Sequence, residues 1–581
     1  MKRTLVIAAI AACTSRAPVA KGIELADLDR AADPCTDFYQ FATGGFHAAH
    51  PIPDGQAHWG RRSAARVLER DQLRDLLAQL ARRRDWPAGG SEQLLGDMYA
   101  SCIAGSGAAM PELTGDVPHA MRRMHALGIA VPFGVIGAMD DREPAQYVAE
   151  VIDAPVDHPD RDQLVHALGS AGDADAVIAL EARLGSAVAD PAPATSKHVD
   201  FAQLGELAPH VDWDAYFADA KLPRGTLEVA DPAYLQAVDR ELAATPAATW
   251  TAYLRWQYIH AMSPPANCVD LIESVFDQLL AREYAKAHFP PAARDRMRSL
   301  AHALVTELHG VVAAEPWLAA ATKATSLAKI DATSFELGYR ERATSYAGLK
   351  ITRDALWANV AAARAFAVDL DRRMIGQPTP RDLWQLAASS PDAYIEPELV
   401  QVVLPAGYLQ PPVFDAAATD AVVYGAIGVG VAHDLTHAID ESGSKTDVMG
   451  RPVDWWTDAD RATFSERSKC VAAQFDGYGL DGKRVLSETI GDLAGLHVAF
   501  AALAHAPPGP VVDGFTPEQQ FFIAWAQFRG EAERPEEQRR MTASDPHPIA
   551  RLRINGALEN TPELARAFGC KAPAKPPCAV W

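Results

Sequence analysis

Two histidines on one face of a predicted helix are the residues of this sequence best placed to do chemistry. His433 and His437 lie four residues apart in the apolar, glycine-containing stretch GVGVAHDLTHAID, and residues at that spacing share a helix face. Both imidazoles can therefore reach one metal ion. With 18 histidines in 581 residues, one such pair is about what chance produces, so the pair alone does not indicate a metal site.

A second pair at the same spacing offers further ligands. Glu488 and Asp492 lie in SETIGDLAGL, among apolar residues that are unusual for an exposed acidic helix face. A catalytic zinc site takes three protein ligands and leaves one position open for water. We expect Glu488 to be the third ligand and Asp492 to hydrogen-bond a ligand imidazole from behind.

Donor groups follow near the carboxyl end of the chain. The stretch DPHPIARLRINGALEN carries His547 and Arg553. Water attack on an amide needs hydrogen-bond donors for the oxyanion that forms. Taken alone, a histidine between two prolines is typical of a surface loop.

The elements that must position these residues fall into two regions. From about 61 to 385 the pattern is mainly helical; Leu73, Leu76, Leu77 and Leu80, for example, recur at helical spacing and predict a packed core. Near residue 390 the hydrophobic pattern is no longer that of helices. A strand is predicted over Leu399–Leu404, followed by Pro-Ala-Gly and Pro-Pro breaks and then by the helix with the two histidines.

Length and charge narrow the class of protein. A chain of 581 residues predicts two or more domains, and 49% hydrophobic residues are enough for a large core. The formal net charge is −21, which repels phosphate backbones, so we expect no nucleic-acid partner. No stretch reaches the ~18 consecutive apolar residues that a membrane span needs.

The amino terminus predicts export. Lys2 and Arg3 precede a short apolar run, Thr4–Ala12, which is typical of a signal peptide. The sequence Ile-Ala-Ala-Cys ending at Cys13 resembles a bacterial lipoprotein cleavage box, so we favour a lipid anchor at Cys13 followed by a tether over residues 14–22. The alternative is an ordinary secretory signal with an incidental cysteine.

Cysteine usage agrees with export. Without Cys13, six of the seven cysteines remain, enough for three disulfides in any of 15 pairings. None shows the Cys-x-x-Cys spacing of a cysteine zinc site.

Taken together, these stretches resemble the neprilysin family of zinc endopeptidases along nearly the whole mature chain. DPCTDFYQFATGGF and IPDGQAHWG are similar to that family's first shared stretch, and LGYRERATSYAGLKI is similar to its helical-domain marker. DAYIEPELVQVVLPAGYLQPPVF resembles the stretch before the zinc helix. YGAIGVGVAHDLTHAID, SETIGDLAGL, DPHPIARLRINGAL and the ending CAVW resemble the zinc helix, the acidic helix and the carboxyl end.

The resemblance implies a fold and a domain organisation. It implies a mainly α, two-lobed neprilysin-like zinc peptidase that encloses an internal chamber, with a small β-sheet in the catalytic lobe. Residues 23–60 and 385–581 would form the catalytic zinc lobe, and residues 61–384 the helical lobe. It also implies three disulfides, Cys35–Cys570, Cys102–Cys268 and Cys470–Cys578. Thr43 and Arg529 occupy both ends of a further bridge found in animal members.

The resemblance also implies a role for each site residue. His433, His437 and Glu488 would bind one Zn²⁺ per chain. The catalytic residues would be Asp434 as general base, Asp492 as the partner of a histidine ligand and His547 as the transition-state donor. The substrate-binding residues would be Asp392, Ala393 and Arg553.

Two of these positions depart from the family pattern. Asp434 stands where the family has Glu; its oxygens retract by roughly 1–1.5 Å, and a misplacement of about 1 Å can cost on the order of 10²-fold in rate. Asp392 stands where an Asn is expected, and a carboxylate accepts hydrogen bonds but does not donate them. Val400 also replaces an Asn in the same stretch.

The sequence therefore predicts an exported zinc metalloendopeptidase that hydrolyses oligopeptides by water attack, with activity reduced by Asp434. The alternative is a catalytically inactive zinc-binding homologue that binds peptides or a partner protein. We expect a periplasmic or outer-membrane lipoprotein whose only membrane contact is the anchor at Cys13, or else a secreted protein. The sequence does not predict an oligomeric state.

Overall fold

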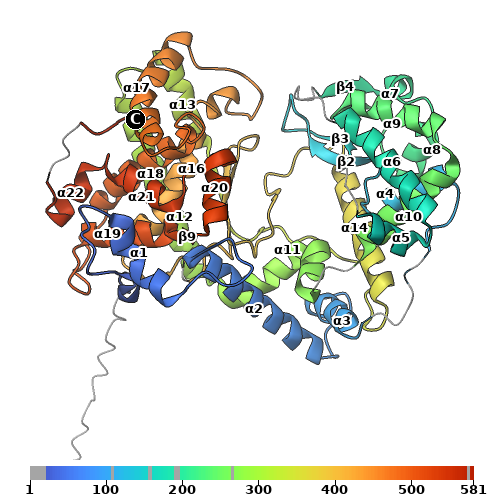
Figure 1. Cartoon of the computed structure of the whole chain (residues 1–581), viewed down its shortest axis with the longest axis horizontal. Helices are drawn as coiled ribbons and strands as arrows, with labels where there is room; N and C mark the ends of the chain where they lie inside the picture. Colours follow the sequence, from blue (N-terminus) through green and yellow to red (C-terminus); the bar gives the residue numbers. More distant parts are fainter. Residues whose placement is uncertain are drawn as a thin grey trace, which may run out of the picture. The chain divides into compact units, whose positions relative to one another are not determined.

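The computed structural model describes residues 21–105, 110, 112–154, 160–188, 196–263, 267–411, 413–571 and 576–581. The predicted signal peptide, the anchor at Cys13 and most of the predicted tether lie outside the described residues. The described chain is mainly helical with three small sheets (Figure 1), which confirms the predicted fold class.

The chain divides into two compact units. The first, here called the terminal unit, comprises the residues up to Arg61, Val413–His433 and Ser468–Val580. The second, here called the middle unit, comprises Arg62–Pro412, Asp434–Arg467 and Trp581. The predicted lobe limits at residues 60 and 384 stay a prediction.

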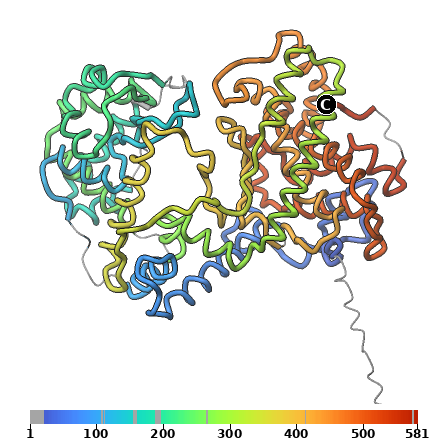
Figure 2. Tube along the Cα trace, turned by 180° about the vertical axis from the view of Figure 1, so that it is seen from behind, coloured from blue at the N-terminus to red at the C-terminus, as the bar shows by residue number. Residues whose placement is uncertain are grey.

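The terminal unit joins segments from opposite ends of the sequence (Figure 2, where blue lies beside red). The strand β1 pairs antiparallel with β9, so that Trp59 lies opposite Ala532, and helix α1 packs on α19 and α21. Its elements are η1 (Leu25–Asp27), α1 (Phe38–Ala49), β1 (His58–Gly60), α15 (Asp420–Val423), η2 (Tyr424–Gly428), α18 (Leu486–His505), α19 (Pro517–Arg529), β9 (Glu531–Glu533), α20 (Pro535–Ser544), α21 (Ala550–Leu558) and α22 (Pro562–Phe568).

Local signals fix where these helices begin. The Asp37 carboxylate accepts a hydrogen bond from the Gln40 N–H at the start of α1. It accepts a second hydrogen bond from the side-chain amide of Asn555 on α21. Thr516 and Gln519 form a reciprocal capping box ahead of α19. A polar cap thus both starts α1 and attaches it to a helix more than 500 residues later in the chain.

The middle unit holds most of the helices and two sheets. One sheet has the strand order β2-β3-β5-β4 and the other β6-β8-β7. Its helices are α2 (Arg61–Arg82), α3 (Ser91–Ile103), α4 (Val117–His125), α5 (Arg161–Leu168), α6 (Ala171–Val188), α7 (Phe201–Leu207), α8 (Trp213–Ala220), α9 (Pro232–Ala244), α10 (Ala247–Met262), α11 (Cys268–His288), α12 (Pro291–Ala314), α13 (Ala320–Ala332), α14 (Leu356–Met374) and the turn η3 (Gly443–Lys445). Its strands are β2 (Phe133–Met139), β3 (Tyr147–Asp153), β4 (Lys197–Asp200), β5 (Thr226–Val229), β6 (Ser334–Gly338), β7 (Tyr394–Glu396) and β8 (Gln401–Pro405).

Besides α2, whose first residue belongs to the terminal unit, two helices are divided between the units, because the unit limits fall inside them. These helices are α16 (Val429–His437) and α17 (Asp458–Gly477). The predicted leucine stripe lies on α2, where Leu73, Leu77 and Leu80 are buried and Leu76 is partly exposed. The stripe is therefore core packing, as the helical spacing predicts.

The strand predicted over Leu399–Leu404 begins two residues later. Residues 397–400 form a turn that joins β7 to β8, and the two strands pair antiparallel. Val400 ends this turn with a φ of 48°, a left-handed conformation that strains a β-branched residue and suits Asn better. The Asn that the family pattern places here therefore has a conformational explanation.

All three implied disulfides are present. They join Cys35 to Cys570, Cys102 to Cys268 and Cys470 to Cys578, and each bridge lies within one compact unit. Among the described residues, no helix combines the length and hydropathy that crossing a bilayer requires.

Candidate metal centre

The helix with the two histidines lies against α18 through glycines. A Cβ at Gly491 would approach His433 Nδ1 to 2.8 Å, and a Cβ at Gly495 would approach the Val429 carbonyl oxygen to 2.6 Å. Only residues without side chains allow this spacing, so the His433 ring can lie flat against α18. A π-helical turn, η2, leads directly into α16; such turns are frequent at functional sites.

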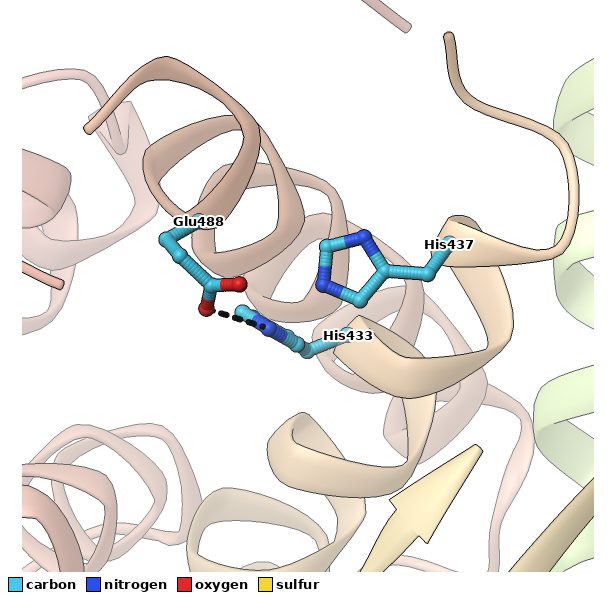
Figure 3. A group of neighbouring side chains, drawn as sticks. All are labelled: His433, His437 and Glu488. Carbon is cyan, nitrogen blue, oxygen red and sulfur yellow. Dashed lines mark ion pairs between the residues drawn. The ribbon is translucent and has the colours of Figure 1, made fainter. Parts of the chain in front are cut away.

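Three side chains from these two helices point toward one another (Figure 3). His433 and His437 project from successive turns of α16, and Glu488 projects from the first turn of α18. One ligand atom from each lies within 4.8 Å of those of the other two. His433 Nε2 lies 3.2 Å from Glu488 Oε2. The sequence-predicted ligand set is therefore brought together.

A carboxylate holds the far nitrogen of each imidazole. Asp492 Oδ1 lies 3.0 Å from His433 Nδ1, and Asp440 Oδ2 lies 2.8 Å from His437 Nδ1. Each carboxylate accepts a hydrogen bond and so favours the tautomer with its proton on Nδ1. Both Nε2 atoms are then left with a lone pair, which is the form in which histidine binds a metal.

Glu488 lies beside an imidazole and a guanidinium. His547 Nε2 lies 2.9 Å from Glu488 Oε2, and Arg553 Nη2 lies 3.6 Å from the same oxygen. Burial alone would raise the pKa of Glu488, but the contacts with the His433 and His547 imidazoles and the charge of Arg553 hold that pKa well below its usual range. Glu488 is therefore a carboxylate, the form that binds metal, across the physiological pH range.

Asp492 is the most deeply buried acid of the site, with an exposed fraction of 0%. Arg553 bonds it with two nitrogens, Nε to Oδ2 and Nη2 to Oδ1, the latter at 2.8 Å. Arg529 Nη2 approaches Oδ1 to 3.8 Å. Burial favours the neutral acid, but the charge of Arg553 and the bond to His433 keep the pKa of Asp492 far below its ordinary value.

His547 is held in place by its own partner. Its Nδ1 lies 2.9 Å from Asp545 Oδ1, which also accepts the His547 backbone N–H at 3.0 Å. The sequence stretch suggested an ordinary loop histidine, yet the structure aims Nε2 at Glu488. The predicted transition-state donor thus lies beside a predicted metal ligand.

The remaining predicted site residues lie on α16 and ahead of β7. Asp434 follows His433 on α16 and is half-buried. Asp392 and Ala393 directly precede β7, an edge strand of the β6-β8-β7 sheet. The Asp392 carboxylate pairs with Arg62 at 2.6 Å and with Arg66 at 2.7 Å, both from α2.

The donor set fits zinc. Two imidazole nitrogens and one carboxylate oxygen are typical zinc ligands, and three protein ligands are the usual number for a catalytic site. The carboxylates behind both imidazoles are the outer partners that metal-binding histidines require. Neither calcium nor magnesium suits this set, because both prefer oxygen ligands.

Three contributors were not identified from sequence as parts of the site. Asp440 lies three residues after His437, and Asp545 lies two residues before His547. Both are short-range acid–histidine spacings that a search of the sequence could have found. Arg529 lies far from Asp492 along the chain, and no local pattern points to their approach.

The chain is similar to known proteins along most of its length. Two regions of the chain, residues 34–340 and 392–576, match peptidase family M13. Endothelin-converting enzyme-like 1 of Rattus norvegicus is 25% identical over 667 aligned positions, which cover 96% of this chain and 85% of the relative. Neprilysin-3 of Drosophila melanogaster is 24% identical, with the same 96% and 85% coverage.

Solved structures give the same picture. The zinc metalloprotease ZMP1 of Mycobacterium tuberculosis in its open state superposes with a TM-score of 0.80 at 26% identity, over 94% of this chain and 99% of that one. PepO of Lactobacillus rhamnosis has a TM-score of 0.75 at 21% identity, over 93% and 97% of the two chains, and shows a shared fold.

A helical two-unit fold with this pair of candidate metal-binding helices is that of a zinc metalloendopeptidase. The chain belongs to peptidase family M13, which the two matched regions establish over most of its length.

Proposed function

We propose that this protein is an exported zinc metalloendopeptidase that hydrolyses oligopeptides, with His433, His437 and Glu488 binding one Zn²⁺ per chain. The observation that carries the proposal is the convergence of these three side chains within 4.8 Å. Asp492 and Asp440 support it, because each holds a ligand imidazole by the nitrogen that does not face the centre.

Zinc in such a site supplies a Lewis acid and lowers the pKa of water to about 7. Asp434 is the general base in this proposal: it takes the proton from the attacking water and delivers it to the leaving amine. His547, held by Asp545, donates a hydrogen bond from Nε2 to the oxygen on which negative charge develops. Arg553 adds positive charge next to Glu488 and keeps Asp492 in place.

Peptide binding is assigned to the edge of the three-stranded sheet. Asp392 and Ala393 lead into β7, whose only strand partner among the described residues is β8. An extended peptide can add to such an edge through main-chain hydrogen bonds. We expect oligopeptides rather than folded proteins as substrates, reached through the internal chamber that the family fold implies.

A second candidate function follows from Asp434. Because its carboxylate is one methylene shorter than Glu, an inactive homologue that binds zinc and peptides without cleaving them is the alternative. This protein would keep the metal centre, since none of the three ligand residues is altered.

Export rests on the amino-terminal residues of the sequence and on the three disulfides, which form in oxidising compartments. A lipid anchor at Cys13 would place the protein in the periplasm or on the outer membrane. Globomycin treatment of expressing cells tests the anchor: accumulation of the unprocessed precursor is expected, and normal processing would favour plain secretion.

The function is tested with the mature protein, a mixed peptide library and metal analysis. We expect one zinc per chain, and turnover that chelation abolishes and added zinc restores. Glu488→Ala should lose both zinc and turnover. Bound zinc without turnover in wild type would favour the inactive homologue, whereas cleavage that resists chelation would contradict the zinc mechanism.

A further inference from the structure

A buried lysine of α13 makes three hydrogen bonds to the segment that follows the metal-binding helix. Lys329 has an exposed fraction of 1%. Its Nζ donates to the Gly443 carbonyl at 2.8 Å, to the Thr446 carbonyl at 2.7 Å and to Thr446 Oγ1 at 3.0 Å. An ammonium group has three protons, so all three are donated to acceptors within the four-residue segment 443–446.

The same segment holds the carboxylate behind His437. Asp440 Oδ1 accepts the Gly443 N–H at 3.0 Å, and the Asp440 carbonyl accepts the Ser444 N–H at 2.8 Å. Asp440 Oδ2 is the atom that lies 2.8 Å from His437 Nδ1. A continuous chain of contacts therefore runs from Lys329 through Gly443 and Asp440 to the imidazole.

Gly443 lets the segment fold back on the end of α16. A Cβ at this position would collide with the carbonyl oxygens of His437 and Ala438. The backbone at Gly443 therefore lies directly against the helix end that carries His437. A shift of Gly443 is transmitted to Asp440, because the two residues share a hydrogen bond.

Nearby carboxylates offset part of the cost of burying the Lys329 charge. Burial lowers the pKa of Lys329 to about 8, although Asp440, Asp447 and Glu398 each act to raise it. The Trp455 ring lies 5.9 Å from Nζ, and its Nε1 donates to the same two carbonyls, at 3.2 Å for Gly443 and 2.9 Å for Thr446. A buried ammonium is costly unless it is fully hydrogen-bonded and near opposite charge, and Lys329 meets both conditions.

We propose that Lys329 is a positioning residue for the metal centre, which fixes the 440–446 segment so that Asp440 holds the His437 imidazole in its metal-binding orientation. The inference rests on the proposed function, because it requires His437 to be a ligand. It assigns a part in metal binding to α13, a helix that carries none of the three ligand residues.

The test compares zinc affinity with fold stability in two matched variants of α13. Lys329→Met removes the three donors but keeps an unbranched side chain that is one atom shorter. Thr322→Val is the control, because Thr322 is also fully buried on α13 and its hydroxyl donates to Asp460 at 2.6 Å, away from the 440–446 segment. Zinc affinity is measured by chelator competition, the coordination by the absorption spectrum of the Co²⁺-loaded protein, and stability by denaturant unfolding of the metal-free protein.

Lys329→Met is expected to lose about 10- to 100-fold in zinc affinity, as losses of outer partners of metal ligands do, and to alter the Co²⁺ spectrum. Thr322→Val should bind zinc like wild type even where its unfolding midpoint falls. Equal affinity losses in the two variants would overturn the inference, because they would reflect general destabilisation.

Two further variants keep the test decisive. If Lys329→Met does not fold, Thr446→Val is used instead, because it removes one of the three acceptors. A smaller loss in zinc affinity is expected for Thr446→Val. Wild-type zinc affinity in this variant would contradict the inference. The double variant Lys329→Met/Asp440→Asn should lose less affinity than the sum of the single losses, because both act on one imidazole. If wild type itself binds no zinc, the proposed function fails; if it binds zinc that Glu488→Ala abolishes while Lys329→Met changes nothing, only this inference fails.

Discussion

Arg553 and Asp492 form a two-point ion pair directly behind the His433 imidazole. Arg553 is 7% exposed and Asp492 is fully buried, and the Nη2–Oδ1 distance is 2.8 Å. The oxygen that receives Nη2 also lies 3.0 Å from His433 Nδ1. One carboxylate therefore orients an imidazole and neutralises a buried guanidinium.

Asp492→Asn should damage both stability and metal binding. The substitution leaves the Arg553 charge buried without its partner, which typically costs ~3–5 kcal/mol, and it weakens the support of His433. We expect a lower unfolding midpoint of the metal-free protein in denaturant and weaker zinc binding in chelator competition. Glu518→Gln is the control, since Glu518 is exposed on α19; wild-type stability in Asp492→Asn would show that the ion pair does not hold the site.

Asp434→Glu should raise catalysis without changing zinc content. The longer side chain of Glu extends the carboxylate about 1 Å further toward the attacking water, and a displacement of this size can change the rate on the order of 10²-fold. The kcat on a cleaved peptide, measured together with zinc per chain, checks this expectation. An unchanged kcat at full zinc occupancy would mean that the reach of residue 434 does not limit turnover.

Gly491→Ala should weaken zinc binding by displacing a ligand. The new methyl carbon would lie 2.8 Å from His433 Nδ1, well inside van der Waals contact, so the ring must move away from Asp492. Gly477→Ala is the matched control: Gly477 ends α17 and a Cβ there meets nothing within 4 Å. The control should keep its zinc affinity and gain up to ~1 kcal/mol of stability, and equal zinc affinity in the two variants would refute the close-packing argument.

Asp392→Asn should lower KM while leaving stability nearly unchanged. An amide can donate to a peptide carbonyl, which a carboxylate does not do. The two ion pairs that are lost, to Arg62 and Arg66, are partly exposed, and such pairs are worth less than about 1 kcal/mol each. Arg66→Gln breaks one pair without adding a donor, so its KM should match wild type; a fall in KM in both variants would assign the effect to charge instead.

Glu69 should make the protein less stable as pH rises from 5 to 9. Burial, with a smaller contribution from Glu273, raises the pKa of Glu69 from 4.5 to about 8. The folded state therefore binds a proton that the unfolded state releases between these values, and the stability contributed by the neutral acid is lost as pH passes 8. Glu69→Gln stays neutral throughout, so the unfolding free energy of wild type should fall relative to that of the variant; a constant difference would contradict the raised pKa.

The convergence of the candidate ligands could be predicted largely because they come in local pairs. His433 with His437 and Glu488 with Asp492 each repeat at four residues, and a helix turns that spacing into a shared face. The order of the motifs along the chain then implied the fold. The glycines that set the distance between α16 and α18 lie in the apolar, glycine-containing stretches of the sequence. The π turn before α16 is seen only in the structure.

Other features depend on contacts between distant residues or on backbone conformation. The partners of Asp392 are Arg62 and Arg66, more than 320 residues earlier, and no local pattern brings them together. The predicted start of β8 is wrong by two residues, because hydrophobic residues continue through the turn before the strand. The positive φ of Val400 is visible only in the backbone. Lys329 reads as one more charged residue of a helix until its three acceptors are known.

The pairing of β1 with β9, and of Cys35 with Cys570, has a consequence for biosynthesis. The terminal unit needs strands, helices and cysteines that are far apart in the chain, with Cys35 and Cys570 separated by 535 residues, so it is incomplete until Cys570 has been synthesised. Most of the middle unit is contiguous in sequence and emerges earlier, as domains that fold during synthesis do. His433 and Glu488 of the candidate metal centre belong to the terminal unit, so we expect metal to be acquired at a late stage of maturation.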